Sequence, residues 1–228
     1  MADEEAKAVQ EASKAVGNIT EAAKQFGGFI AKYISGPLEQ GIGIYEDKLK
    51  FIRYERQLRL MKRTEELSAE YGLALPSRTV PMKIAIPIFQ AASMEEDDYL
   101  QDKWASLLIN ASNAEMKNEI KRVHISILEN LSALDVLTLD KIYSDDEDRR
   151  EGIYIQDLPQ GIDKGIAANI MEKMQNGPSK EIVLSLANLA RLGCIDPTAT
   201  YGGGVNFDVV TRTELGRDFI DACRLKHQ

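Results

Sequence analysis

One long helical pattern constrains the fold of this chain more than any other feature. It runs from about Ile44 to Tyr71 and is followed by Gly72, a residue type that commonly ends helices. Apolar residues recur along one side at roughly heptad spacing, which predicts that this side faces the core: Ile44, Phe51, Tyr54, Leu58 and Met61. The other side mixes aliphatic and basic residues, with Leu49, Ile52, Leu60 and Leu67 among the aliphatic ones. The pattern predicts a mainly helical protein with one long basic helix.

The basic residues of this helix form a candidate binding surface. Between Lys48 and Arg63 there are seven basic residues and one acidic residue, Glu55. Such a patch can bind nucleic acid, anionic lipid or an acidic partner. The candidate anion-binding or partner-binding patch consists of Lys48, Arg53, Arg56, Arg59, Lys62 and Arg63. The alternative, which we favour, is a solvated helix in which pairs at four-residue spacing, such as Lys62 with Glu66, neutralise the charge.

Further helices follow this one. Pro81 opens an apolar run in which Pro87 is expected to kink or restart the helix, because proline lacks a backbone N–H. Ser93 and Glu96 have the spacing of a capping box, which predicts a new helix start. The next segment supplies a clean apolar stripe for the core: Leu100, Trp104, Leu107, Leu108 and Ala111.

The second half of the chain has a different pattern, in which short strands are predicted among the helices. Ser132 with Asp135 marks a helix start, and helices are expected at 134–143, around 166–174 and up to Leu192, before Gly193. Short strands are expected at 153–156, through 195 and at 205–210, with a glycine turn at 202–204. Thr211 with Glu214 has capping-box spacing before a last helix. This order is typical of a winged helix, an elaborated helix-turn-helix.

These patterns predict three regions. Residues 1–35 read as amphipathic, Ala- and Gly-rich helices, residues 36–128 as a helical domain, and residues 129–228 as a winged-helix-like α+β domain. The whole-chain charge of −8 argues against a surface built to neutralise phosphates. Residues 123–228 contain 11 basic and 17 acidic residues. We therefore favour protein contact or dimerisation over DNA binding for the last domain.

The composition also bears on location. No stretch approaches the roughly 18 apolar residues of a membrane-spanning helix, and the acidic start is wrong for a secretory signal. Two cysteines without paired spacing, Cys194 and Cys223, suit a reducing compartment. We therefore expect a cytoplasmic protein. The amphipathic segment from Val16 to Tyr45, next to the basic helix, keeps open a peripheral position at the inner membrane.

No set of residues predicts catalysis or a metal site. The acids at 95–98 are explained by a helix start, and His124 lies between Ile120 and Ile127 on an apolar face, as a core histidine would. Both cysteines lie within predicted structure and lack an identified base, so they are expected to be small buried hydrophobes. The sequence therefore predicts a protein that is not an enzyme, with no cofactor, no metal and no evident small-molecule substrate.

A series of short landmarks follows in a fixed order over roughly residues 36 to 140. These landmarks are Gly36-Pro37-Leu38-Glu39, Asp47-Lys48, Val80-Pro81, Pro87, the run from Ala92 to Asp97, Leu100-Gln101, Trp104-Ala105, Leu107-Leu108, Asn110-Ala111, His124, and the segment Ile127 to Leu139 with Leu131, Ser132 and Leu134. In their joint order the chain resembles the abortive-infection alpha family of bacterial proteins. The resemblance implies a role in abortive infection, in which an infected cell stops phage propagation at its own expense. It implies no catalytic residues.

Three functions follow as hypotheses. The first is a non-enzymatic anti-phage defence protein that acts through a protein partner or a second copy of itself. The second is a membrane-associated effector that uses the amphipathic N-terminal segment and the basic helix on an anionic membrane. The third is a DNA-binding regulator acting through the winged-helix-like domain, which the acidic charge of that domain disfavours.

Overall fold

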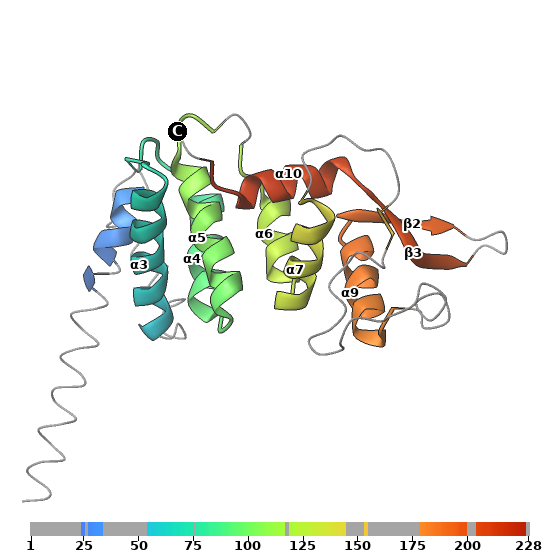
Figure 1. The fold of residues 1–228 in the computed structure, drawn as a ribbon. Coiled ribbons are helices and arrows are strands. Elements are labelled where there is room, and N and C mark those ends of the chain that lie inside the picture. Colours follow the sequence, from blue (N-terminus) through green and yellow to red (C-terminus); the bar gives the residue numbers. More distant parts are fainter. Residues whose placement is uncertain are drawn as a thin grey trace, which may run out of the picture. The chain divides into compact units, whose positions relative to one another are not determined.

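The computed structural model describes residues 24–25, 27–33, 54–74, 76–116, 119–144, 153–154, 178–199 and 204–226. The described part is mainly helical, as predicted (Figure 1). The chain forms two compact units: unit 1 comprises Met1–Ile125 with Leu225–Gln228, and unit 2 comprises Ser126–Arg224. The division at residue 125 falls inside helix α6 (Arg122–Glu129), and so does the boundary expected after residue 128.

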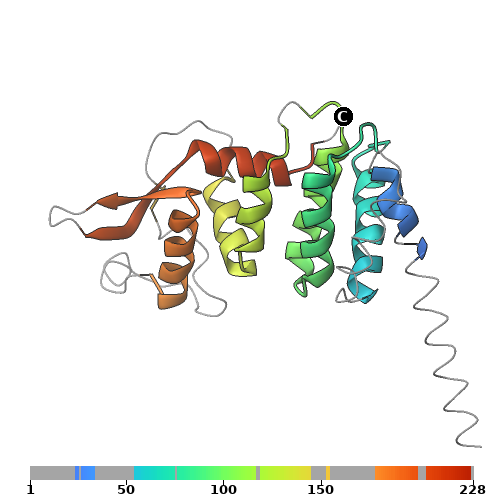
Figure 2. The same cartoon turned by 180° about the vertical axis from the view of Figure 1, so that it is seen from behind.

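Unit 1 is built on three helices, α3 (Tyr54–Glu70), α4 (Met82–Met94) and α5 (Asp98–Ser112). Each contacts the other two, and opposite views show them side by side (Figures 1 and 2). Their largest fully buried side chains form the core: Leu60, Ile88, Phe89, Trp104, Leu107, Leu108 and Ile109. Helical residues 27–33 add Phe29 and Tyr33, whose rings contact Phe89. The apolar stripe predicted for α5 is confirmed as core.

The buried side of α3 differs from the prediction. Gln57, Leu60, Thr64 and Leu67 are buried, whereas Leu58 and Met61 of the expected core side are only half-buried. The predicted core side of α3 was wrong because the side that is buried includes two polar residues, Gln57 and Thr64. Thr64 is tolerated there because its hydroxyl donates to the Leu60 carbonyl oxygen within the same helix, at 2.7 Å. Ile44, Phe51 and the side chain of Tyr54 lie outside the described residues.

The ends of these helices explain two further differences. Ser93 does not cap a helix: it is buried in the last turn of α4, and its hydroxyl donates to the Phe89 carbonyl at 2.6 Å. Asp97 is the actual N-cap of α5 and accepts from the backbone N–H groups of Tyr99 and Leu100. Helix α4 continues through Pro87 without a restart. Gly72 ends α3 as predicted, with a φ of 71° that favours glycine.

Unit 2 contains the helix start predicted at Ser132. Ser132 and Asp135 form a capping box that opens α7 (Ala133–Ile142). Helix α9 (Lys180–Arg191) begins at the N-cap Ser179 and is followed by Gly193, whose φ is 73°. Helices α7 and α9 pack against each other, and their buried apolar side chains form the core of this unit: Val136, Leu139, Ile142, Ile182, Leu186 and Leu189. The helix expected around 166–174 lies outside the described residues.

A small antiparallel sheet follows α9. Strands β2 (Ile195–Ala199) and β3 (Val205–Arg212) pair with each other, and the two-residue β1 (Ile153–Tyr154) pairs with the other edge of β3. The strand order is β1-β3-β2, with an irregularity between Pro197 and Thr198. In both views the β2–β3 ribbon extends away from α9 (Figures 1 and 2). The tip of the predicted glycine turn, at 202–203, lies outside the described residues.

The last helix, α10 (Glu214–Cys223), begins at Thr213 and not at Thr211. Thr211 belongs to strand β3, whereas the Thr213 hydroxyl accepts from the Gly216 backbone N–H at 2.9 Å. The capping box expected at Thr211 was therefore wrong by two residues. The sequence offers two threonines near this boundary, and the length of the strand decides which one caps the helix.

Tyr143, at the end of α7, forms hydrogen bonds with the residue just before β2 and with the residue just after β3. Its hydroxyl donates to the Cys194 carbonyl at 2.7 Å and accepts from the Thr213 backbone N–H at 3.0 Å. Burial raises the pKa of this hydroxyl, so it remains protonated and able to donate. A Cβ at position 216 would collide with the Cys194 carbonyl and the Tyr143 hydroxyl, which explains glycine there. Arg212 lies over the Tyr143 ring.

Candidate functional site

The basic patch predicted from the sequence lies on α3. Arg56, Arg59, Lys62 and Arg63 belong to the described part of this helix, whereas Lys48 and Arg53 lie outside the described residues. The four described cations do not share one environment. Lys62 is 77% exposed, and the three arginine side chains are only 25–32% exposed. The arginines therefore lie against another part of unit 1.

Arg63 makes the strongest pairing. Its Nε and Nη2 atoms donate to the two carboxylate oxygens of Asp102 on α5, at 2.7 and 2.8 Å, and its Nη1 atom donates to Glu66 at 2.7 Å. This two-pronged geometry matches the planar guanidinium to a carboxylate. The hydrogen bonds that Arg63 donates to Asp102 and Glu66 raise the pKa of Arg63, and the bond that Glu66 accepts from Arg63 lowers the pKa of Glu66. Arg63 thus fixes α3 against α5.

Arg56 and Arg59 share a single acid. Both Nη1 atoms approach Oδ1 of Asp98, at 3.4 and 3.0 Å respectively. Lys62 pairs with Glu66 at 3.5 Å, as the four-residue spacing predicts. Four cations of α3 are thus paired with three carboxylates, those of Glu66, Asp98 and Asp102. The described part of the patch is a mixed-charge helix face that holds α3 against the N-terminal half of α5.

The acidic residues at positions 95–98 take part in the start of α5 and in its contact with α3. Glu95 accepts from the backbone N–H groups of Glu96 and Asp97, both at 2.9 Å. Asp97 caps α5, and Asp98 binds two arginines of α3, Arg56 and Arg59. Within the ranges that the structure describes, no three His, Cys, Asp or Glu side chains form a group suited to a metal ion.

The other residues with chemical potential are buried. His124 is fully buried in α6, as predicted, and its Nδ1 atom accepts from the Lys121 backbone N–H at 3.3 Å. Cys194 and Cys223 are buried free thiols, as predicted. Burial raises the pKa of Cys194 to about 12, so its thiol stays protonated and weakly nucleophilic at neutral pH. His227 lies outside the described residues.

Sequence reasoning missed the exposed apolar residue of α9. Leu184 is 59% exposed, although Ile182, Leu186 and Leu189 of the same helix are buried. The signal was present in the spacing, because position 184 lies off the stripe formed by positions 182, 186 and 189. The charged residues Lys180, Glu181 and Arg191 are also exposed on this helix. The outer face of α9, defined as these four exposed residues, therefore has one apolar residue, Leu184, among three charged residues whose charges nearly balance.

The comparison with protein families finds a match over most of the chain. The family model for abortive infection alpha matches residues 55–223. The chain belongs to this family, and the match covers both units, from α3 to the end of α10. No curated protein and no solved structure shows a significant match. Of the helices that the structure describes, none has the length and apolar character needed to cross a membrane.

Proposed function

We propose that this chain is a non-enzymatic, cytoplasmic abortive-infection protein that acts by binding another protein through the outer face of α9. Family membership supports the biological role. The exposed Leu184 is the observation that carries the mode of action. An exposed leucine on a helix face gains from burial against a partner's apolar surface, by about 1 to 2 kcal/mol for a side chain of this size.

The winged-helix-like arrangement of unit 2 is part of this proposal. The described elements follow in the order α7, β1, α9, β2, β3 and α10, which suits a winged helix with the β2–β3 ribbon as its wing. In that arrangement α9 has the position of the recognition helix and the β2–β3 ribbon is the wing. The same position serves for docking a protein when its exposed side chains suit one, because fold does not determine function.

The charges of α9 favour a protein over DNA as the partner. Lys180 and Arg191 are its two basic residues, and Glu181 offsets one of them. The Arg191 guanidinium donates to the Asn188 side-chain oxygen, at 2.8 and 3.2 Å, which holds it along the helix. DNA-binding helices rely on several cationic contacts to phosphates. A helix face with an exposed leucine and nearly balanced charge is better suited to another protein.

The pairing on α3 also bears on the membrane hypothesis. Binding to anionic lipid draws on cations that remain open to phosphate groups. Arg56, Arg59 and Arg63 already bind carboxylates of α5, and Lys62 binds Glu66. Membrane attachment through this face would exchange those contacts for lipid contacts, so the mixed-charge face gives the hypothesis little support.

Phage plating tests the proposal. The full-length protein is produced in a phage-sensitive bacterial host, and plaque numbers are compared across a broad phage panel for the wild type, Leu184→Asp and Leu184→Met. We expect the wild type and Leu184→Met to reduce plaques and Leu184→Asp to lose most of that protection while remaining folded. Full protection by Leu184→Asp would refute the proposed contact.

A further inference from the structure

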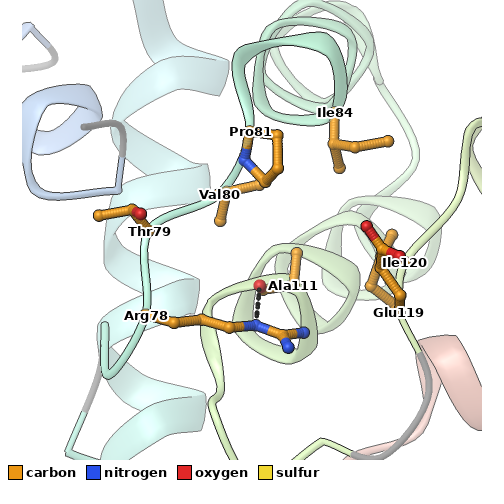
Figure 3. A pocket seen from close by; sticks show the side chains of 8 residues that line it. All are labelled: Arg78, Thr79, Val80, Pro81, Ile84, Ala111, Glu119 and Ile120. Carbon is orange, nitrogen blue, oxygen red and sulfur yellow. Dashed lines mark hydrogen bonds between the residues drawn. The ribbon is translucent and has the colours of Figure 1, made fainter. Parts of the chain in front are cut away.

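Unit 1 contains a pocket that none of the functions considered above uses. Its volume is about 320 Å³, and it lies between the segment before α4, the first turn of α4, the end of α5 and the residues just before α6 (Figure 3). Four of its lining residues are buried apolar side chains, namely Val80, Ile84, Ala111 and Ile120. Arg78, Thr79, Pro81 and Glu119 complete the lining. The pocket has an apolar floor and a polar rim.

Backbone hydrogen bonds hold one wall of the pocket in place. The N–H groups of Ser77 and Arg78 both donate to the Ser112 carbonyl at the end of α5, at 3.0 and 2.9 Å. Two residues later, the Val80 N–H donates to the Tyr33 carbonyl at 2.7 Å. The wall is thus fixed on both sides of Thr79. A site held in place before binding loses less conformational freedom when a ligand arrives.

The Arg78 guanidinium is also fixed. Its Nε atom donates to the Ala111 carbonyl at 2.9 Å, and its Nη2 atom lies 3.4 Å from the Asn110 carbonyl. A cation at a helix C-terminus is favourable, which accounts for this anchoring. Anchoring uses two of the five N–H donors of the side chain, and the described residues use none of the other three. Figure 3 shows the guanidinium end directed along the side of the cavity toward Glu119.

Glu119 provides the opposite charge on the far wall. Figure 3 shows its carboxylate next to Ile120, below Ile84 and above the level of the guanidinium. Among the described residues the carboxylate makes no ion pair with Arg78. The pocket therefore presents an anchored cation and an anion on different walls, with apolar surface between them.

We propose that this pocket binds a free amino acid with an apolar side chain. The ligand's carboxylate binds the unused N–H groups of Arg78, its ammonium group binds Glu119, and its side chain lies on the apolar floor. A guanidinium is suited to a carboxylate because it can donate two parallel hydrogen bonds. The volume lies at the lower end of the range of about 300 to 1,000 Å³ for ligand pockets, which favours a ligand of this size over a nucleotide. This binding does not depend on the proposed contact through α9.

Calorimetry with L-leucine tests the proposal. Titrations of the full-length protein compare L-leucine with leucinamide, which lacks the carboxylate, and with N-acetyl-leucine, which lacks the ammonium group. We expect L-leucine to bind and each analogue to bind at least about tenfold more weakly, because each leaves one charged group of the pocket unpaired. No detectable binding of L-leucine at millimolar concentration, or equal binding of all three compounds, would overturn the proposal.

Two variants locate the site. Glu119→Gln is expected to weaken L-leucine binding at least about tenfold and to leave the weak binding of N-acetyl-leucine unchanged, because that analogue has no ammonium group to lose. Glu115→Gln is the matched control, since Glu115 is an exposed acid of the same connection that does not line the pocket. Unchanged L-leucine binding in Glu119→Gln, or an equal loss in both variants, would show that leucine binds elsewhere.

Discussion

Replacing Tyr143 with phenylalanine tests how unit 2 is held together. The substitution keeps the ring and removes a hydroxyl that donates to the Cys194 carbonyl and accepts from the Thr213 N–H. Cys194 is fully buried, so its carbonyl is left without this donor and out of reach of water. A buried group left unsatisfied costs about 1 to 3 kcal/mol, and the loss at the part-buried Thr213 adds about 1 kcal/mol. We expect Tyr143→Phe to lower the free energy of unfolding by about 3 kcal/mol.

Urea denaturation measures this loss. Far-UV circular dichroism follows the helices of both units, whereas the fluorescence of the single tryptophan, Trp104, follows unit 1. For an m-value of about 2 kcal/mol/M, the transition of unit 2 should move to lower urea by about 1.5 M. Tyr99→Phe, on the surface of α5, is the control and is expected to change stability by less than about 0.5 kcal/mol. A Tyr143→Phe protein as stable as this control would refute the role given to the hydroxyl.

Three other predictions concern packing, charge and the buried thiol. Gly216→Ala should destabilise unit 2 by about 2 to 3 kcal/mol because its Cβ meets the Cys194 carbonyl, while Gly28→Ala, which faces open space, should be neutral or slightly stabilising in the same denaturation assay. Arg63→Met should cost about 1 kcal/mol by losing the two-pronged pair with Asp102, and Lys62→Met less than about 0.5 kcal/mol; equal losses would contradict this difference. Cys194, with its pKa raised to about 12, should react with a thiol reagent at pH 8 only on unfolding. Because an unfolded thiol ionises near pH 8.5, the contribution of the Cys194 thiol to the free energy of unfolding should fall as pH rises above about 8.5. Rapid labelling of the folded protein at pH 8 would contradict the labelling prediction, because it would show that the thiol is accessible.

Much of the fold follows from the sequence because its strongest signals are local. The Ser132–Asp135 capping box, Gly72, Gly193 and the apolar stripe of α5 are each contained within a single helix or its ends, and the structure confirms them. Two of the errors arise where a polar residue lies in the interior. Ser93 has capping spacing, but its hydroxyl donates a hydrogen bond to a backbone carbonyl four residues earlier in its own helix. The buried Thr64 hydroxyl does the same.

The candidate site was less predictable because it depends on contacts between distant segments. The spacing within α3 predicts the pair of Lys62 with Glu66, but it says nothing about Asp98 and Asp102, which lie on α5. The partners of Arg59 and Arg63 are about forty residues away in sequence, and only the packing of α3 against α5 brings them together. The pocket at Arg78 and Glu119 has the same origin, since three stretches of the chain that are separate in sequence line it.

Site-specific photo-crosslinking from position 184 tests the central claim most directly. A photoreactive amino acid replaces Leu184, or Glu70 as an exposed control on α3, in the full-length protein, and cells are irradiated during phage infection. Contact through the outer face of α9 predicts a discrete protein adduct from position 184 and none from position 70. An adduct from position 184 with DNA in place of protein, or no adduct from this position in cells that the protein protects, would contradict the account.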